Sequence, residues 1–249
     1  MTPQVSSVVA LVPAKATSLR LPGKNISPLD GHPLIAYTIS SAREADLFTE
    51  VVVSTEDPET AEISERYGAT VVERPTETAD PMSPDIEWLL HAMNGRGEDA
   101  FAILRPTSPF RSAATIRRAW ERFLELGDRA DSIRAVEPVR QHPGKMWLVE
   151  GDLMRPVMER PDPGTPWHSM QTQSLPQVWA QNSSLEIAWS RVVAETGTRE
   201  GRVVAPFLTD GYESLNVDDE EDWERAERLV SSGAAVLTVV GRPPYAHGP

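Results

Sequence analysis

The segment Val8-Val9-Ala10-Leu11-Val12-Pro13 decides the fold class of this chain of 249 residues. A short apolar run that ends at a proline is typical of a central strand in a parallel sheet, where both faces are buried. A polar loop with the turn signals Pro22-Gly23 and Asp30-Gly31 follows it. Residues 33–45 then have the pattern of a helix with proline in its first turn. Strand, loop and helix in this order predict the start of a βαβ unit.

The same alternation continues through the first half of the chain. We expect strands at 51–53, 70–72 and 101–104, and helices at 58–67, 84–93 and 112–126. Gly68 and Gly127 are placed to end the first and last of these helices, and Ser112 to cap the last one. This alternation predicts an α/β fold with a mostly parallel sheet. Ligands of such sheets bind beyond the carboxyl ends of the strands, here in the loops after Val12, Val53 and Leu104.

The pattern changes after about Pro138. Prolines and tryptophans become frequent, and helical periodicity is lost until Asp219. We predict one domain, residues 1–249, with an inserted dimerisation arm at 138–181. The arm's tryptophans need burial, and a partner subunit is a reasonable place for them: Trp147, Trp167 and Trp179. Beyond the arm we expect a strand at 185–189, a helix at 219–230 and a last strand at 234–240.

Composition excludes several classes of function. A formal net charge of −13 without a basic run argues against nucleic-acid binding, which requires charges that neutralise phosphates. No apolar stretch approaches the ~20 residues that span a bilayer. The absence of cysteine excludes disulfides, thiolate metal sites and a cysteine nucleophile. The first apolar run is short and has no basic residue before it, so we expect a cytoplasmic protein rather than a secreted one.

The loop after the first strand carries a concentrated set of polar groups. Cations, hydroxyls and an amide occur together in residues 13–25: Lys15, Thr17, Ser18, Arg20, Lys24 and Asn25. A polyphosphate needs such a set, because cations offset its charge while hydroxyl and amide groups hold its oxygens. The spacing is neither that of a P-loop nor that of a Rossmann glycine loop. Composition alone would favour a solvated basic loop, but the spacing favours a site.

That spacing resembles the signature of nucleotidyltransferases that activate sugar acids with CTP. In that family Pro-Ala-Arg, a small pair and Ser lead to Pro-Gly-Lys-Asn. Further motifs resemble the family in order: 31–39, 53–57, 67–69 with Arg74-Pro75, Leu104-Arg105-Pro106-Thr107-Ser108-Pro109-Phe110-Arg111, Asn182, and Ser214-Leu215-Asn216-Val217-Asp218 followed by 222–223 and 226–227. The chain is similar over nearly its whole length to the acylneuraminate cytidylyltransferases (CMP-sialic acid synthetases). The resemblance implies a Rossmann-like, three-layer fold and a homodimer whose arm reaches the neighbouring active site.

The resemblance also implies a reaction. A hydroxyl of a nonulosonic (sialic-acid-like) sugar acid would attack the α-phosphate of CTP, and pyrophosphate would leave, with Mg²⁺ bridging phosphate oxygens. It implies catalytic roles for Arg20, Lys24 and Asp218, and a metal site at Asp218 and Asn216. The implied nucleotide-binding residues are Lys15, Ser18, Asn25, Arg74 and Arg105. The implied acceptor-binding residues are Lys145, Gln171, Gln173 and Asn182.

Three departures from the family's pattern leave alternatives open. Asn216 stands where an aspartate is usual, and it can ligate a metal but brings no charge. Arg105 replaces a glutamine, and arginine cannot accept a hydrogen bond from the amino group of cytosine. Gln171 and Thr172 stand where an arginine helps to hold the sugar carboxylate, although Lys145 offers another cation. A non-sugar anion such as a phosphonate is therefore an alternative acceptor, and Asn216 favours a non-catalytic nucleotide-binding homologue.

Other polar residues have simpler explanations. Arg74 is as well explained as an ordinary loop arginine, and Arg111 is better explained by a structural turn. Asp219 and Asp222 lie in the first turn of a predicted helix, where carboxylates complement the dipole. A histidine isolated in a proline-rich arm is more often structural or exposed than catalytic, which applies to His142 and His168.

Overall fold

The computed structural model describes residues 7–18, 20–80 and 82–245. These residues form two compact units. The larger unit contains the described residues up to Ala135 and from Asn182 onwards, and the smaller unit is Val136–Gln181. The smaller unit coincides closely with the arm that we expect at 138–181. Its role in dimerisation stays a prediction.

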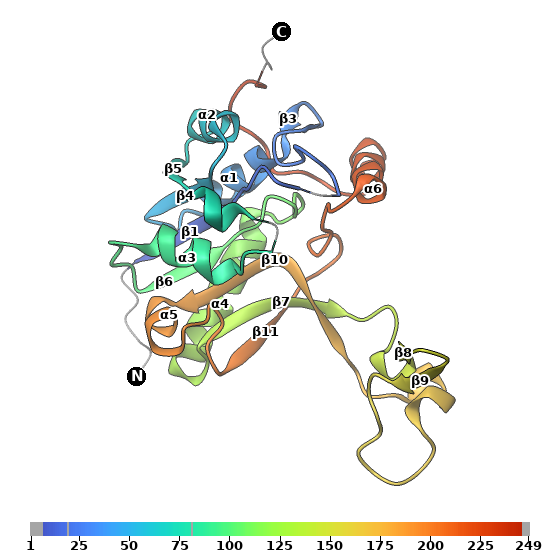
Figure 1. Cartoon of the computed structure of the whole chain (residues 1–249). Coiled ribbons are helices and arrows are strands. Elements are labelled where there is room, and N and C mark those ends of the chain that lie inside the picture. The colour runs from blue at the N-terminus through green and yellow to red at the C-terminus, as the bar shows by residue number, and fades with distance from the viewer. Residues whose placement is uncertain (1–6, 19, 81, 246–249) are drawn as a thin grey trace. The chain divides into compact units, whose positions relative to one another are not determined.

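A mixed sheet organises the chain (Figure 1). In the described part of the chain it has seven strands in the order β11-β7-β10-β6-β1-β4-β5. Strand β1 pairs in parallel with both β4 and β6, β4 pairs in parallel with β5, and β10 runs antiparallel to β6. The strands are β1 (Val8–Pro13), β4 (Glu50–Thr55), β5 (Thr70–Glu73), β6 (Ala100–Ile103), β7 (Ser132–Pro138), β10 (Trp179–Trp189) and β11 (Val204–Leu208). This arrangement confirms the predicted α/β fold with a mostly parallel sheet.

Helices cover the two faces of the sheet. They are α1 (Leu34–Ala45), α2 (Pro58–Arg66), α3 (Asp85–Met93), α4 (Ala113–Leu126), α5 (Ser190–Thr196) and α6 (Glu220–Ser231). Single 3₁₀ turns lie between the larger elements, at η1 (Thr76–Ala79), η2 (Gly127–Arg129), η3 (Pro143–Lys145), η4 (Trp167–Ser169) and η5 (Thr172–Ser174). Two short hairpins complete the description, β2–β3 (Pro28–Leu29 and His32–Pro33) and β8–β9 (Trp147–Glu150 and Leu153–Pro156). Each described helix is too short or too polar to cross a membrane.

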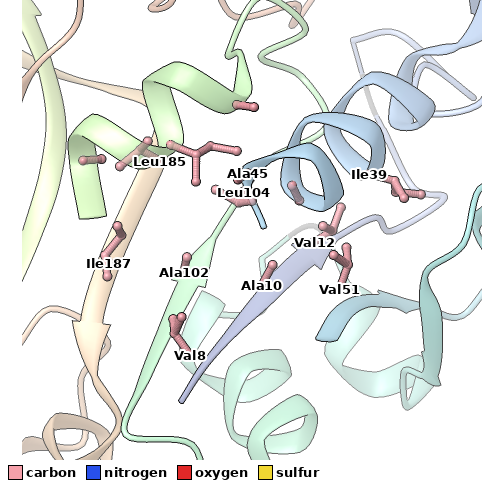
Figure 2. Close-up of a cluster of buried hydrophobic side chains, with 14 of the residues drawn as sticks. Val8, Ala10, Val12, Ile39, Ala45, Val51, Ala102, Leu104, Leu185 and Ile187 are labelled. Atoms are coloured by element: carbon pink, nitrogen blue, oxygen red, sulfur yellow. The ribbon is translucent and has the colours of Figure 1, made fainter. Parts of the chain in front are cut away.

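The core explains why β1 is apolar throughout. Successive side chains of a strand point to opposite faces. Val8, Ala10 and Val12 therefore pack with residues of α1 and α4 on one face, as Figure 2 shows for Ile39 and Ala45 of α1. Val9 and Leu11 pack on the other face, with Trp88, Leu89 and Ala92 of α3. Burial on both faces makes β1 the rigid support for the loop that follows it.

The helix ends follow the expected chemistry. The Ser112 hydroxyl accepts a hydrogen bond from the N–H of Thr115 at 3.2 Å and so caps α4. Gly68 has a φ of +93°, a conformation that side chains with a Cβ rarely adopt, and it follows the end of α2. Asp219 caps α6 by accepting the N–H of Asp222 at 3.0 Å. The capping roles of Ser112 and Asp219 are confirmed.

Three expectations about secondary structure are wrong. Residues 234–240 form no strand, although Ala235 is buried and Leu237 packs beside it. Ala235, Leu237 and Val240 pack with residues of α1 and α6, whereas Val236 and Val239 are exposed. Helix α5 forms where we expect no helix, because its seven residues are too few for a clear period. Strands β7 and β11 are also absent from the expectation, since charged residues interrupt the apolar pattern of β7 and a proline interrupts that of β11.

The smaller unit is held together by its own side chains. The buried His142 ring accepts the Gly144 N–H at Nδ1 and donates from Nε2 to the Pro176 carbonyl, both at 3.0 Å. These bonds use both ring nitrogens, so His142 is structural, as expected. The Trp147 ring packs on the His168 ring with centroids 4.6 Å apart. Trp179 is 40% exposed, and its burial by a partner subunit stays a prediction.

Candidate active site

A cavity of about 550 Å³ lies in the larger unit, beyond the carboxyl ends of β1, β5 and β6. This is where a parallel sheet is expected to bind a ligand. The predicted residues that line it are Lys15, Ser18, Arg20, Lys24, Asn25, Arg74, Arg105, Asn216 and Asp218. Every predicted catalytic, nucleotide-binding and metal-binding residue is therefore brought to one cavity. Asp57, after β4, instead lines a smaller cavity of about 250 Å³ that shares Lys15 and Lys24.

Asp218 joins Arg20 and Lys24, the two cations of the first loop that are predicted to be catalytic. The Lys24 ammonium lies 2.8 Å from Asp218 Oδ1 and also donates to the Val217 carbonyl at 3.0 Å. The Arg20 guanidinium lies 3.0 Å from Asp218 Oδ2. Burial alone would raise the pKa of Asp218, but the hydrogen bonds and charges of Lys24 and Arg20 outweigh it and lower the pKa. The carboxylate is thus held ionised beside two cations.

Local structure places Asp218 at this point. It precedes the cap of α6, and its N–H donates to the Asp222 carboxylate at 3.0 Å. Asp222 therefore takes part in the hydrogen bonds at the start of the helix, as expected. The N–H of Val217 donates to the Thr107 carbonyl at 2.8 Å. That bond ties the Ser214–Asp218 motif to the Pro-Thr-Ser-Pro turn after β6.

Asn216 supplies a second oxygen beside Asp218. Its Nδ2 donates to Asp218 Oδ2, while its Oδ1 is buried without a hydrogen-bond partner among the described residues. An ionised carboxylate and an unsatisfied amide oxygen are the donors that a hard divalent cation prefers. Within residues 7–18, 20–80 and 82–245, no three acidic or histidine side chains form a metal cluster. The pair fits Mg²⁺ only as part of a shell to which other ligands contribute.

The rest of the first loop shapes the cavity wall through its backbone. Asn25 Nδ2 donates to the Lys15 carbonyl at 3.2 Å, which closes the loop on itself. The Ser18 hydroxyl accepts the Leu21 N–H at 3.4 Å. Gly23 has a φ of +69° in the turn that precedes Lys24, a conformation suited to glycine. These bonds fix the backbone of the loop that carries Lys15, Arg20 and Lys24.

Arg74 and Arg105 line the cavity with a different set of partners. Arg74 is buried, and it donates from Nε to the Ser54 hydroxyl at 3.1 Å and from its terminal nitrogen to the Ser54 carbonyl at 3.2 Å. Its guanidinium carbon also lies 5.4 Å from the centre of the Trp88 ring. Burial lowers the pKa of Arg74. Arg74 is therefore both a structural arginine and a cavity residue.

Arg105 is paired with a carboxylate that sequence reasoning missed. Its terminal nitrogen lies 2.5 Å from Asp85 Oδ2, in the first turn of α3. Arg199 also binds that oxygen, and the Trp88 indole N–H donates to Oδ1 at 3.1 Å. Burial alone would raise the pKa of Asp85, but the charges of Arg105 and Arg199 lower it to about 2. In the sequence Asp85 is indistinguishable from a carboxylate that complements a helix dipole.

Glu186 extends the cluster behind Asp85. This carboxylate is 12% exposed and lies 2.6 Å from Arg134, 3.4 Å from Arg199 and 3.9 Å from Arg105. The sequence did contain a signal, because a charged residue stands inside the apolar stretch 185–189. A buried carboxylate in a central strand needs cationic partners. Its partners are far away in sequence, so their identity could not be predicted.

Arg111 is structural, as expected. It is 1% exposed and donates to the carbonyls of Arg105 and Ser184 and, at 2.8 Å, to the Thr38 hydroxyl. These bonds fix the backbone of the turn that carries Arg105.

The predicted acceptor-binding residues are divided between the two units, with Asn182 in the larger one and the others in the smaller one. Asn182 does not line the cavity, whereas its neighbour Ser183 does. The Asn182 amide donates to the Thr209 hydroxyl at 3.0 Å and accepts the Ser184 N–H at 3.1 Å, so an acceptor would have to replace one of these bonds. Lys145 belongs to the smaller unit, where its ammonium lies 3.5 Å from the His168 carbonyl. Gln171 and Gln173 are exposed in the same unit.

Comparison with known proteins identifies the family. Residues 9–142 match the profile of the cytidylyltransferase family. The CMP-N,N'-diacetyllegionaminic acid synthase of Legionella pneumophila is 31% identical over 239 residues, which cover 92% of this chain and 99% of that protein. The N-acylneuraminate cytidylyltransferase of Escherichia coli is 28% identical over 225 residues, 89% of this chain and 51% of that protein.

A solved structure shares the fold. The CMP:2-keto-3-deoxy-manno-octonic acid synthetase, solved as a complex with CTP, superposes with a TM-score of 0.68 at 15% identity. The superposition covers 92% of this chain and the whole of that one. Together, the motif order, the sheet and the full-length match show that this chain is a CTP-dependent cytidylyltransferase and belongs to the acylneuraminate cytidylyltransferase family.

Proposed function

We propose that this enzyme transfers CMP from CTP to a nonulosonic sugar acid and releases pyrophosphate. The observation that carries the proposal is the contact of Asp218 with both Lys24 and Arg20 on the wall of the cavity. The names of the relatives support the acceptor class, since one is a synthase of a CMP-legionaminic acid and another acts on N-acylneuraminate.

The reaction requires the protein mainly to position the substrates and to stabilise the charge on the phosphate oxygens. A hydroxyl oxygen of the acceptor forms a bond to the α-phosphorus, the bond from that phosphorus to the pyrophosphate oxygen breaks, and the hydroxyl proton is released. Negative charge builds on the phosphate oxygens during this exchange, and fixed cations stabilise it. Lys24 is the better fixed of the two loop cations, because its side chain is 11% exposed whereas that of Arg20 is 64% exposed. We assign Lys24 to the reacting phosphate and Arg20 to the more exposed end of the triphosphate.

The remaining cavity residues bind the nucleotide in this proposal. Lys15, Ser18 and Asn25 hold ribose and phosphate oxygens, and Arg74 and Arg105 lie beside the base. Asp218 and the unsatisfied Asn216 Oδ1 would hold Mg²⁺. When bound, the metal supplies positive charge that offsets the charge of the triphosphate.

The smaller unit supplies the acceptor site in this proposal. Lys145 takes the role of the cation for the acceptor's carboxylate, and Gln171 and Gln173 offer hydrogen bonds to hydroxyl or acyl groups. Exposed apolar side chains on the β8–β9 hairpin support a homodimer formed through this unit, since Val149, Leu153 and Met154 are 74%, 78% and 58% exposed. The arm would then serve the active site of the dimer.

An acceptor panel tests the proposal. The protein is incubated with CTP and Mg²⁺ and one acid at a time: sialic, legionaminic, pseudaminic or 3-deoxy-manno-octulosonic acid, or a phosphonate. We expect acceptor-dependent pyrophosphate release with a nonulosonic acid. Release with the phosphonate alone would favour the alternative that Gln171 and Thr172 suggest, a non-sugar anion. Binding of CTP without turnover on any acceptor would favour the non-catalytic homologue that Asn216 suggests.

A further inference from the structure

The cavity contains a second carboxylate to which the reaction assigns no role. Among the described residues that line the cavity, Asp85 and Asp218 carry carboxylates. Asp218 contacts the cations of the first loop, whereas Asp85 contacts Arg105, Arg199 and Trp88. Asp85 is 36% exposed at its side chain, so it presents an anionic edge to whatever occupies that part of the cavity.

The hydrogen bonds of Asp85 leave room for one more donor. A carboxylate has about four acceptor positions, two on each oxygen. Arg105 and Arg199 donate to Oδ2, and the Trp88 indole donates to Oδ1. The second position of Oδ1 has no donor in the described part of the chain. A ligand that donates one hydrogen bond here would complete the set.

Cytosine has that donor next to an acceptor. Its base-pairing edge presents the 4-amino donor beside the N3 acceptor, whereas uracil presents the O4 acceptor beside the N3–H donor. Arg105 offers only donors, and its guanidinium lies 2.5 Å from the acceptor-only Asp85. The two side chains together present a donor and an acceptor side by side. They match the edge of cytosine and mismatch the edge of uracil at both positions.

We propose that Asp85 and Arg105 read the base as a pair, with Asp85 Oδ1 accepting the 4-amino group of cytosine and Arg105 donating to its ring acceptors. A single glutamine can both donate and accept, and in this chain the two functions are divided between two residues. The inference rests on CTP being the nucleotide substrate. It makes Asp85 a specificity-determining residue.

The surroundings make the pair rigid enough for this role. Arg199 contacts the same oxygen of Asp85 as Arg105, so two guanidinium groups hold this carboxylate. Trp88 is 2% exposed and fixes Oδ1 through its indole N–H. The arginines also hold the pKa of Asp85 at about 2, so the group is an acceptor only at neutral pH. A site whose buried groups are committed in this way discriminates strongly against a ligand that cannot pair with them.

The test compares CTP with UTP. The ratio of kcat/KM for CTP to that for UTP is measured with one acceptor, and the two dissociation constants are measured by calorimetry without acceptor. Asp85→Asn keeps the shape and adds a donor that suits O4 of uracil. We expect it to lower the CTP:UTP ratio about tenfold or more, both in turnover and in binding. Asp85→Glu, which keeps the charge but displaces the oxygen, should also lower the ratio and serves if Asp85→Asn does not fold.

The matched control is Glu186→Gln. Glu186 belongs to the same charge cluster but does not line the cavity, so this variant should keep the wild-type CTP:UTP ratio even if its melting temperature falls. An unchanged ratio in Asp85→Asn, or an equal loss in Glu186→Gln, would overturn the proposal. If no acceptor supports turnover, the acceptor assignment fails, and the binding ratio still decides the role of Asp85.

Discussion

The ammonium of Lys24 lies 2.8 Å from Oδ1 of Asp218, although 194 residues separate the two in the chain. The loop after β1 supplies one partner and the turn before α6 supplies the other. The cationic side of the cavity therefore depends on segments from both ends of the chain.

Lys24→Ala should reduce turnover far more than stability. We expect kcat/KM for CTP to fall about a hundredfold or more, because one fixed donor to the reacting phosphate is lost. The melting temperature should change little, since Arg20 still pairs with Asp218. Pyrophosphate release and thermal unfolding measure the two effects. Equal losses in both, or normal turnover, would mean that Lys24 is a structural residue.

Changing the charge at positions 216 and 218 should shift the Mg²⁺ requirement of the enzyme, in opposite directions for the two variants. Asn216→Asp adds a charged ligand and should lower the Mg²⁺ concentration that gives half of the maximal rate. Asp218→Asn removes the charge and should raise that concentration. Titration of the rate with Mg²⁺ at saturating CTP measures both variants. A pair of variants with the wild-type requirement would show that these oxygens do not bind the metal.

Arg111→Met should destabilise the fold, at a position that does not line the cavity. It leaves the carbonyls of Arg105 and Ser184 and the Thr38 hydroxyl without their buried donor. We expect the free energy of unfolding in urea to fall by about 2 kcal/mol. Arg122→Met at a surface position is the control, and its effect should stay below about 0.5 kcal/mol. No difference between the two variants would show that the Arg111 hydrogen bonds contribute nothing net.

Acid should reduce the contribution of Asp85 to stability. Its pKa of about 2 in the folded protein lies below the ordinary value of 3.8, so the stabilisation is present above about pH 3.8 and is lost as the pH falls towards 2. The difference in unfolding free energy between the wild type and Asp85→Asn should therefore shrink on acidification. Urea unfolding at a series of pH values, from neutral downwards, measures it. A difference that is constant or grows with acid would contradict the Asp85–arginine pairing.

The β8–β9 hairpin should control the oligomeric state. If it forms the dimer contact, Leu153→Asp places a charge in an apolar interface and should convert dimers to monomers. Val239→Asp, at an 85% exposed position of the larger unit, should leave the mass unchanged. Light scattering after gel filtration gives the masses. A monomeric wild type would refute the dimer, and a dimeric Leu153→Asp variant would refute its location.

The sequence was most informative where local patterns determine structure. The apolar run of β1, the cap at Ser112 and the terminating Gly68 have short-range causes, and the structure confirms each element. The apolar stretch at 234–240 has the same local pattern, but it forms no strand, and Ala235 is buried whereas Val236 and Val239 are 82% and 85% exposed. A local pattern cannot predict strand pairing, which depends on neighbours distant in sequence.

The residues of the candidate site also fall into two groups, those that the motifs predict and those that no motif marks. Lys24 and Asp218 lie in motifs that resemble a family, and that resemblance alone predicts that both belong to one site. Asp85 and Arg199 lie in no such motif, and their contact joins residues 114 apart in the chain. A carboxylate in the first turn of a helix is common, so nothing local marks Asp85 as part of a cavity.

The carboxylate that holds Lys24 and Arg20 has a consequence for how the enzyme meets its nucleotide. The two cations already share an internal counter-ion, which offsets part of their charge and of their mutual repulsion. A triphosphate that binds Lys24 and Arg20 therefore replaces the Asp218 carboxylate as their anionic partner. The cost of desolvating Lys24, whose side chain is 11% exposed, is met in large part when the chain folds. The affinity for CTP should accordingly depend on the contrast between phosphate and carboxylate as partners, rather than on net positive charge, in a protein whose overall charge is −13.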